Sequence, residues 1–212
     1  MDKYKKNQRY VMRSDMTTRL THLTKPESGK IEDDEDAFNR LWEILLSSKI
    51  KANKIKHSPN MSWSEQPVVC FQDAPLVNIA ENLKYERKIQ NNKARYSAFG
   101  IRMLKKDIIE RGGRPVIYDT VKNAQEMKKR QEKDLWRIVT FKYDEENDYY
   151  IDWMHEREWR VPDDIYFDYS EIEVIVKSPK YYQKLINRCI DNDKTDILRE
   201  IKGIVVLNSV YA

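Results

Sequence analysis

Apolar residues recur at helical spacing in one segment near the start of this chain. They occupy positions i, i+3, i+4, i+7 and i+8 of that segment, at Phe38, Leu41, Trp42, Leu45 and Leu46. An acidic run, residues 33–36, comes directly before them, where the dipole of a helix favours negative charge. The pattern predicts an amphipathic helix.

Shorter apolar runs, bounded by proline, glycine or charged residues, are typical of strands. They predict strands at 18–24, 68–71, 99–104, 115–118, 156–161, 173–176 and 203–207. Further helices are expected at 74–90, 120–134 and 181–200. Because helices and strands do not alternate strictly, we expect an α+β fold, with mixed or antiparallel central sheets and flanking helices. With no repeat and no long linker, the sequence predicts one domain over residues 1–212, and residues 1–15 could be a loose basic arm.

The composition is polar but rich in aromatic residues. Hydrophobic residues make up 40% and charged residues 35%, yet 5 Trp and 13 Tyr argue against disorder. The formal net charge of +4 permits contact with a nucleic acid without requiring it. Cys70 and Cys189 lie far apart in apolar contexts, which favours buried thiols over a disulfide. The scattered His22, His57 and His155 lack zinc-ligand spacing, so we expect no metal site.

The chain has no apolar run approaching the roughly 20 residues of a membrane span. Its first residues, Met-Asp-Lys-Tyr-Lys-Lys, do not resemble a signal peptide. We therefore expect a cytoplasmic protein with no membrane partner.

Two glutamates, Glu156 and Glu158, stand two positions apart in a predicted strand. Residues i and i+2 of a strand point to one face, which would place both carboxylates together with Arg160 next in the row. Such a pair could transfer protons or stabilise an oxocarbenium ion. The alternative is an exposed strand with cross-strand ion pairs. Local composition favours the ion-paired strand.

His22 and Thr24 form a second pair of this spacing, on the first predicted strand. An imidazole and a hydroxyl on one face can bind the vicinal hydroxyls of a sugar, although a lone strand histidine is more often structural. Several aromatic residues beside polar ones could stack on a base or belong to the core. They are Tyr96, Phe99, Tyr118, Tyr149, Tyr150 and Trp153. No glycine-rich nucleotide loop and no serine or cysteine nucleophile motif is evident in the sequence.

Several segments, taken in order, resemble the AbiGi family of abortive phage resistance proteins, a bacterial phage-defence group described mainly as antitoxin-like. The resemblance covers residues 18 to about 180. The segments are Thr21-His22-Leu23-Thr24-Lys25-Pro26, Leu41-Trp42-Glu43-Ile44-Leu45, Val69-Cys70-Phe71-Gln72-Asp73-Ala74-Pro75-Leu76, Phe99-Gly100-Ile101, Gly112-Gly113-Arg114-Pro115-Val116-Ile117-Tyr118 and Trp153-Met154-His155-Glu156-Arg157-Glu158-Trp159-Arg160-Val161-Pro162.

That family is in turn distantly similar to ADP-ribosyltransferases of the DarT type. The resemblance implies an ADP-ribosyltransferase-like fold, NAD as substrate, and a nucleic acid or a protein as acceptor. It implies that His22, with Thr24, binds the NAD ribose and that Glu158 is the catalytic glutamate. Glu156 would orient the acceptor, as the first residue of a Glu-x-Glu element. Tyr96 and Phe99 become candidates for stacking on nicotinamide.

Two other functions stay open. The Ser-Thr-Ser middle strand of active transferases is not evident, which favours a non-catalytic antitoxin or defence regulator that binds a partner chain through the same fold. A phosphate-handling enzyme related to RNA 2′-phosphotransferases would need a pair of arginines near His22. The sequence analysis offers only Arg19 for that role.

Overall fold

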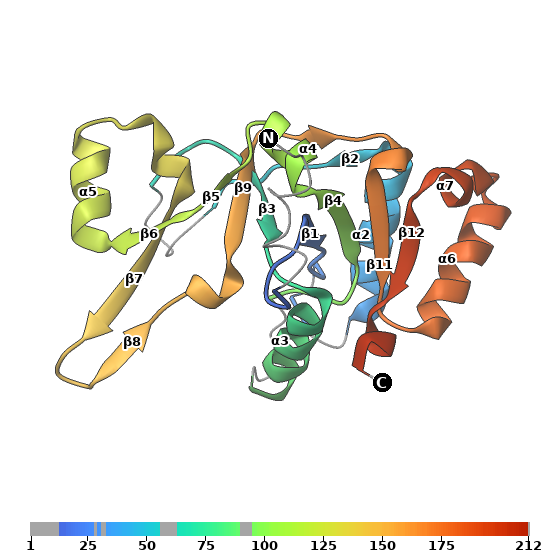
Figure 1. The fold of residues 1–212 in the computed structure, drawn as a ribbon, viewed down its shortest axis with the longest axis horizontal. Helices are drawn as coiled ribbons and strands as arrows, with labels where there is room; N and C mark the ends of the chain where they lie inside the picture. The colour runs from blue at the N-terminus through green and yellow to red at the C-terminus, as the bar shows by residue number, and fades with distance from the viewer. Residues whose placement is uncertain (1–12, 28, 31–32, 56–62, 90–94, 212) are drawn as a thin grey trace. The chain divides into compact units, whose positions relative to one another are not determined.

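The computed structural model describes residues 13–27, 29–30, 33–55, 63–89 and 95–211 (Figure 1). The chain divides into two compact units, each assembled from separate segments. The first unit comprises residues 1–49, 74–105 and 166–212, and the second comprises 50–73 and 106–165. Most of the predicted basic arm lies outside the described residues.

Four neighbouring sheet strands of mixed direction, in the order β12-β11-β4-β1, form the centre of the first unit. Strand β4 pairs antiparallel with both β1 and β11, and β11 pairs parallel with β12. The strands are β1 (Arg19–Leu23), β4 (Gly100–Leu104), β11 (Ile172–Val176) and β12 (Gly203–Val206). The other elements of this unit are β2 (Lys49–Ile50, at the edge of the unit), α2 (Asp34–Ser47), α3 (Leu76–Ile89), α6 (Pro179–Asp191), α7 (Thr195–Glu200) and the 3-10 helices η3 (Tyr169–Glu171) and η4 (Leu207–Tyr211).

The core of this unit forms because the strands and helices bury apolar positions at their own periods. Leu20, Ile101, Met103 and Val174, on one face of the sheet, are fully buried. The rings of Phe38 on α2 and Tyr181 on α6 lie 5.8 and 4.7 Å from that of Phe99, which precedes β4. On the other face, Leu23 and Ile175 belong to a second cluster with α3, through residues such as Ile79, Ala80 and Leu83.

The second unit contains two groups of paired strands, β3-β9-β5 and β6-β7-β8. Strand β9 pairs antiparallel with β3 and β5, whereas β7 pairs parallel with β6 and antiparallel with β8. Ala124 of α5 packs with Ile138 of β7 and with Trp63 in a small core. The elements are β3 (Val68–Gln72), α4 (Lys105–Glu110), β5 (Arg114–Pro115), β6 (Ile117–Thr120), α5 (Val121–Lys129), η1 (Lys133–Arg137), β7 (Ile138–Asp144), β8 (Tyr149–Ile151), η2 (Met154–Glu156), β9 (Glu158–Pro162) and β10 (Ile165–Tyr166, at its edge).

These elements confirm the α+β class with mixed sheets and flanking helices. The predicted helix at residues 38–46 is confirmed as α2, whose first turn is capped by the Asp33 side chain. The predicted strand at 156–161 is wrong in its first part. Glu156 ends the 3-10 helix η2, Arg157 follows with a left-handed φ of 44°, and the strand begins only at Glu158.

Candidate functional site

Buried polar side chains gather around the two predicted carboxylates in the second unit. Gln72, Asp73, Glu156 and Arg160 are all buried, and they make up four of the seven buried polar or charged residues in the described part of the chain. Burying such groups is costly unless they are hydrogen-bonded. Their concentration therefore marks the strongest candidate site in this unit.

Arg160 binds the carboxylate of Glu158 with two hydrogen bonds. Its Nε donates to Glu158 Oε1 at 2.8 Å and its Nη2 to Oε2 at 3.2 Å. The remaining nitrogen, Nη1, donates to the carbonyl oxygens of Trp136 and Ile138 at 2.7 and 3.2 Å. The Arg160 side chain is 4% exposed and that of Glu158 is 20% exposed. The Glu158 carboxylate is thus fixed in orientation, and the guanidinium offsets its charge.

Glu156 is fixed by different partners. Its Oε2 accepts a hydrogen bond from the side-chain amide of Gln72. Gln72 itself lies directly opposite Glu158 in the β3–β9 ladder. The half-exposed His155 places Nε2 3.7 Å from Glu156 Oε1, which is ion-pair distance for a protonated imidazole but too far for a hydrogen bond.

The backbone between the two glutamates is strained. Arg157 has a φ of 44° and a ψ of 47°, a conformation that residues other than glycine rarely adopt. Its carbonyl oxygen accepts a hydrogen bond from the Asp73 amide at 3.1 Å, which fixes this turn against the end of β3. Strain of this kind is found disproportionately at functional sites. It turns Glu156 off the strand, so the two carboxylates do not share a strand face as the sequence pattern predicted.

Tyr118 and Cys70 complete the cluster. The Tyr118 hydroxyl accepts a hydrogen bond from the Glu158 amide at 3.3 Å. Burial, followed by the nearby carboxylates, raises the pKa of Tyr118. Burial, and next the charge of Glu158, raises the pKa of Cys70 well above its usual range. Both groups are therefore neutral at physiological pH, which fits a hydrogen-bonding hydroxyl and an inert thiol.

The sequence analysis missed Gln72 as a site residue. Gln72 belongs to the Phe71-Gln72-Asp73 segment quoted for the family resemblance, and a buried strand that ends in two polar residues was the available signal. Tyr118 stood among six aromatic residues that sequence reasoning could not separate. The pairing of β3 with β9 brings Gln72 to the glutamates, and a hydrogen bond from the Glu158 amide joins the Tyr118 hydroxyl of β6 to them.

The residues assigned to the NAD ribose and to nicotinamide, His22, Thr24, Tyr96 and Phe99, all lie in the first unit. The hydroxyl of Thr24 is buried and donates to the carbonyl oxygens of Ala37 and Phe99 at 3.0 and 3.2 Å. The Phe99 ring is fully buried against the rings of Phe38 and Tyr181. The structure therefore brings Thr24 and Phe99 together, but within the core of this unit, where their side chains are accounted for by packing.

His22 and Tyr96 have more open surroundings. His22 is half-buried on β1, opposite Ile101 of β4. Tyr96 is also half-buried and packs against the cluster that includes Leu23 and α3. The ribose and nicotinamide contacts assigned to these two residues stay predictions.

The first unit does contain a pair of arginines. Arg19 of β1 and Arg102 of β4 both bind Glu173 of β11, at 3.0 and 2.8 Å. Burial lowers the pKa of Arg102, an effect that Glu173 opposes. The pair shares a sheet face with Thr21, whereas His22 points to the opposite face, because neighbouring residues of a strand alternate. A phosphate site combining these arginines with His22 does not fit this geometry.

Within the described residues, no three or more His, Cys, Asp or Glu side chains gather as metal ligands. No helix in that same part of the chain has the length and apolar character needed to cross a membrane. In comparisons with known proteins, no family model, no curated protein and no solved structure matches the chain. The structure therefore defines this protein by its fold class, which is mixed α+β. In its second unit, a cluster of polar side chains surrounds two glutamates that hydrogen bonds hold in place.

Proposed function

We propose that this protein is an NAD-dependent mono-ADP-ribosyltransferase that modifies a macromolecule during conflict between phage and host. The observation that carries the proposal is the pair of anchored glutamates, Glu156 bound by Gln72 and Glu158 by Arg160, on either side of the strained Arg157. The order of the resembling segments supports the same assignment.

In the proposed reaction, the bond between ribose C1′ and the nicotinamide nitrogen breaks, and nicotinamide leaves with the bonding electrons. The ribose then carries positive charge, which the Glu158 carboxylate stabilises from a fixed position. A nucleophilic group of the acceptor attacks C1′, and Glu156 accepts the proton that this group loses.

Arg160 has a defined part in this chemistry. Two hydrogen bonds keep the carboxylate in one orientation, so little reorganisation accompanies the development of positive charge. The same guanidinium weakens the field of Glu158 at the reacting centre. The proposal therefore predicts that the fixed position of the Glu158 carboxylate matters more to catalysis than the strength of its charge.

The test is transfer of label from NAD, carrying a radiolabelled adenylate, to the DNA, RNA or protein of a host lysate. We expect Glu158→Gln to abolish transfer while the fold survives. Glu173→Gln is the matched control, because Glu173 is also a strand glutamate bound by arginine, with a side chain 18% exposed. Full label transfer by Glu158→Gln would show that the assignment is wrong.

A second candidate is a non-catalytic antitoxin or defence regulator that binds a nucleotide or a partner chain through the same fold. Two observations favour it: Arg160 binds both oxygens of Glu158, and Thr24 and Phe99 have packing roles. This candidate predicts NAD binding by calorimetry without nicotinamide release, or no NAD binding at all. Sustained release of nicotinamide by the pure protein would exclude it.

A further inference from the structure

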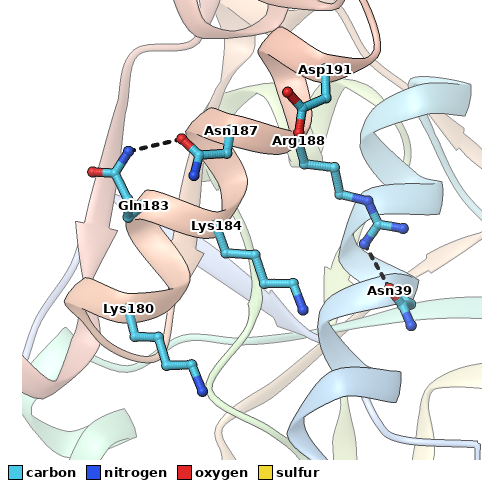
Figure 2. A pocket seen from close by; sticks show the side chains of 7 residues that line it. All are labelled: Asn39, Lys180, Gln183, Lys184, Asn187, Arg188 and Asp191. Atoms are coloured by element: carbon cyan, nitrogen blue, oxygen red, sulfur yellow. Dashed lines mark hydrogen bonds between the residues drawn. The ribbon is translucent and has the colours of Figure 1, made fainter.

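An open groove of about 700 Å³ lies between α2 and α6 of the first unit (Figure 2). Every residue that lines it is polar or charged. One comes from α2 and six from α6, and they are Asn39, Lys180, Gln183, Lys184, Asn187, Arg188 and Asp191. Three of the seven are cations and one is a carboxylate, so the groove attracts anions.

The cations follow one face of α6. Lys180, Lys184 and Arg188 are four residues apart in turn, a spacing that places helical side chains on the same side. Figure 2 shows all three side chains extending from α6 toward α2. At 1.5 Å of rise per residue, the first and last lie about 12 Å apart along the helix axis. A row of cations at this spacing matches the regularly repeated charges of a polymer better than a single compact anion.

Arg188 is held in place before any ligand binds. Its guanidinium lies over the rings of Phe38 and Trp42, with centroid distances of 5.6 and 5.2 Å. Its Nη1 also donates to the side-chain oxygen of Asn39 at 2.6 Å. Both contacts restrict the side chain while leaving its charge intact, which lowers the entropic cost of binding an anion.

Lys184 is placed differently from its two neighbours. It forms an ion pair with Glu35, which also accepts a hydrogen bond from the Tyr181 hydroxyl at 3.1 Å. Its charge is therefore shared with a carboxylate of this chain. Lys180 interacts with the same carboxylate more weakly, so Lys180 and Arg188, at the ends of the row, are the cations assigned to ligand contacts.

The remaining side chains of the lining favour one class of polyanion over another. Protein–protein interfaces usually depend on buried aromatic or aliphatic anchors, and this lining contains neither. It offers amides instead. Gln183 donates to Asn187 Oδ1 at 3.0 Å, which leaves the Asn187 amide protons directed away from that contact. Amide side chains can reach the base edges of an unpaired strand.

We propose that this groove binds the phosphodiester backbone of a single-stranded nucleic acid, with Lys180 and Arg188 each contacting a phosphate and Asn187 facing the bases. The inference does not depend on the transferase proposal, since binding is measured without NAD. If both hold, the groove would favour a nucleic acid as the acceptor.

The test is fluorescence anisotropy of the full chain with a labelled oligouridylate between about 50 and 200 mM salt. Two phosphate contacts on a single strand contribute about 1.4 to the slope of log affinity against log salt, about sevenfold over this range. We expect Lys180→Gln/Arg188→Gln to lower the slope by that amount and to weaken binding at least about tenfold at the low-salt end. Lys180→Gln alone, at an exposed position, should lower the slope by about half as much.

The control is Lys122→Gln/Lys129→Gln, which removes the same charge from exposed positions on α5 of the second unit and should keep the slope. Arg188→Lys keeps the charge and should retain most of the binding. Thermal unfolding confirms that each variant is folded. An unchanged slope in the α6 double variant, or an equal loss in the α5 control, would overturn the proposal. Competition by polyglutamate as effective as by oligouridylate would overturn the choice of nucleic acid.

Discussion

Replacing Arg160 by methionine should destabilise the second unit strongly. Methionine fills much of the same volume but can donate no hydrogen bond. The substitution removes both bonds to the Glu158 carboxylate and both bonds to the carbonyl oxygens of Trp136 and Ile138. It therefore removes the side-chain hydrogen bonds that join β9 to the segment between η1 and β7.

The structure sets the size of the effect. Breaking a buried ion pair by removing one partner costs about 3 to 5 kcal/mol, because the remaining charge is left without compensation. The Glu158 side chain is 20% exposed, so water can solvate part of its carboxylate. We therefore expect a loss at the lower end, about 3 kcal/mol of unfolding free energy.

Urea unfolding followed by tryptophan fluorescence measures this loss. Four of the five tryptophans, all except Trp42, belong to the second unit, so the signal reports mainly on that unit. With a slope of about 2 kcal/mol per molar urea, the midpoint should fall by about 1.5 M. Arg114→Met is the matched control, since Arg114 stands opposite Arg160 on β5 but is exposed, and it should cost less than about 1 kcal/mol.

A double variant tests whether the uncompensated charge of Glu158 causes the loss of stability. In Glu158→Leu/Arg160→Met no charge is left behind, so the double variant should be more stable than Arg160→Met alone. A loss below about 1 kcal/mol for Arg160→Met would refute the reasoning. Additive costs of the two substitutions would also refute it, because they would show that the pair does not interact.

Three further outcomes are expected. Gly100→Ala should cost at least about 3 kcal/mol of unfolding free energy in urea, because an added Cβ would lie 2.0 Å from a carbonyl oxygen of β1. The control, Gly29→Ala, has a φ of 66° and open space around it, and should cost about 1 kcal/mol. Equal costs would contradict the steric argument. Burial raises the pKa of Cys189 to about 11, so at pH 8 the native thiol should react with iodoacetamide on the order of 100 times more slowly than the unfolded one, and equal rates would show that it is not protected. The hydrogen bond from Lys184 lowers the pKa of Glu35, so this carboxylate stabilises the fold above its unfolded pKa and loses that effect as the pH falls through the folded value. Wild type and Glu35→Gln should therefore differ in midpoint at pH 7 and converge as the pH falls through the lowered pKa, and a constant difference would contradict the pairing.

The sequence alone determined the helices and strands that the spacing of their own apolar residues is enough to identify. The apolar spacing from Phe38 to Leu46 defines α2, and the Val68–Phe71 run defines β3, because burial of a regular face stabilises each element whatever its neighbours are. The α+β class followed from the order of such elements. Sequence reasoning also anticipated the row formed by Glu158 and Arg160, since two-residue periodicity within a strand is local.

The tertiary structure alone decided what the polar residues of these elements contact. The backbone turn at Arg157, which a strand pattern cannot reveal, took Glu156 out of the predicted row, and β3 supplied Gln72 as its partner from 84 positions away. In the same way, the carbonyl oxygens that accept the Thr24 hydroxyl come from α2 and from the residue before β4. Apolar burial can be recognised from spacing because it is non-directional. Hydrogen bonds and ion pairs require particular atoms at particular distances, and only the assembled fold sets those.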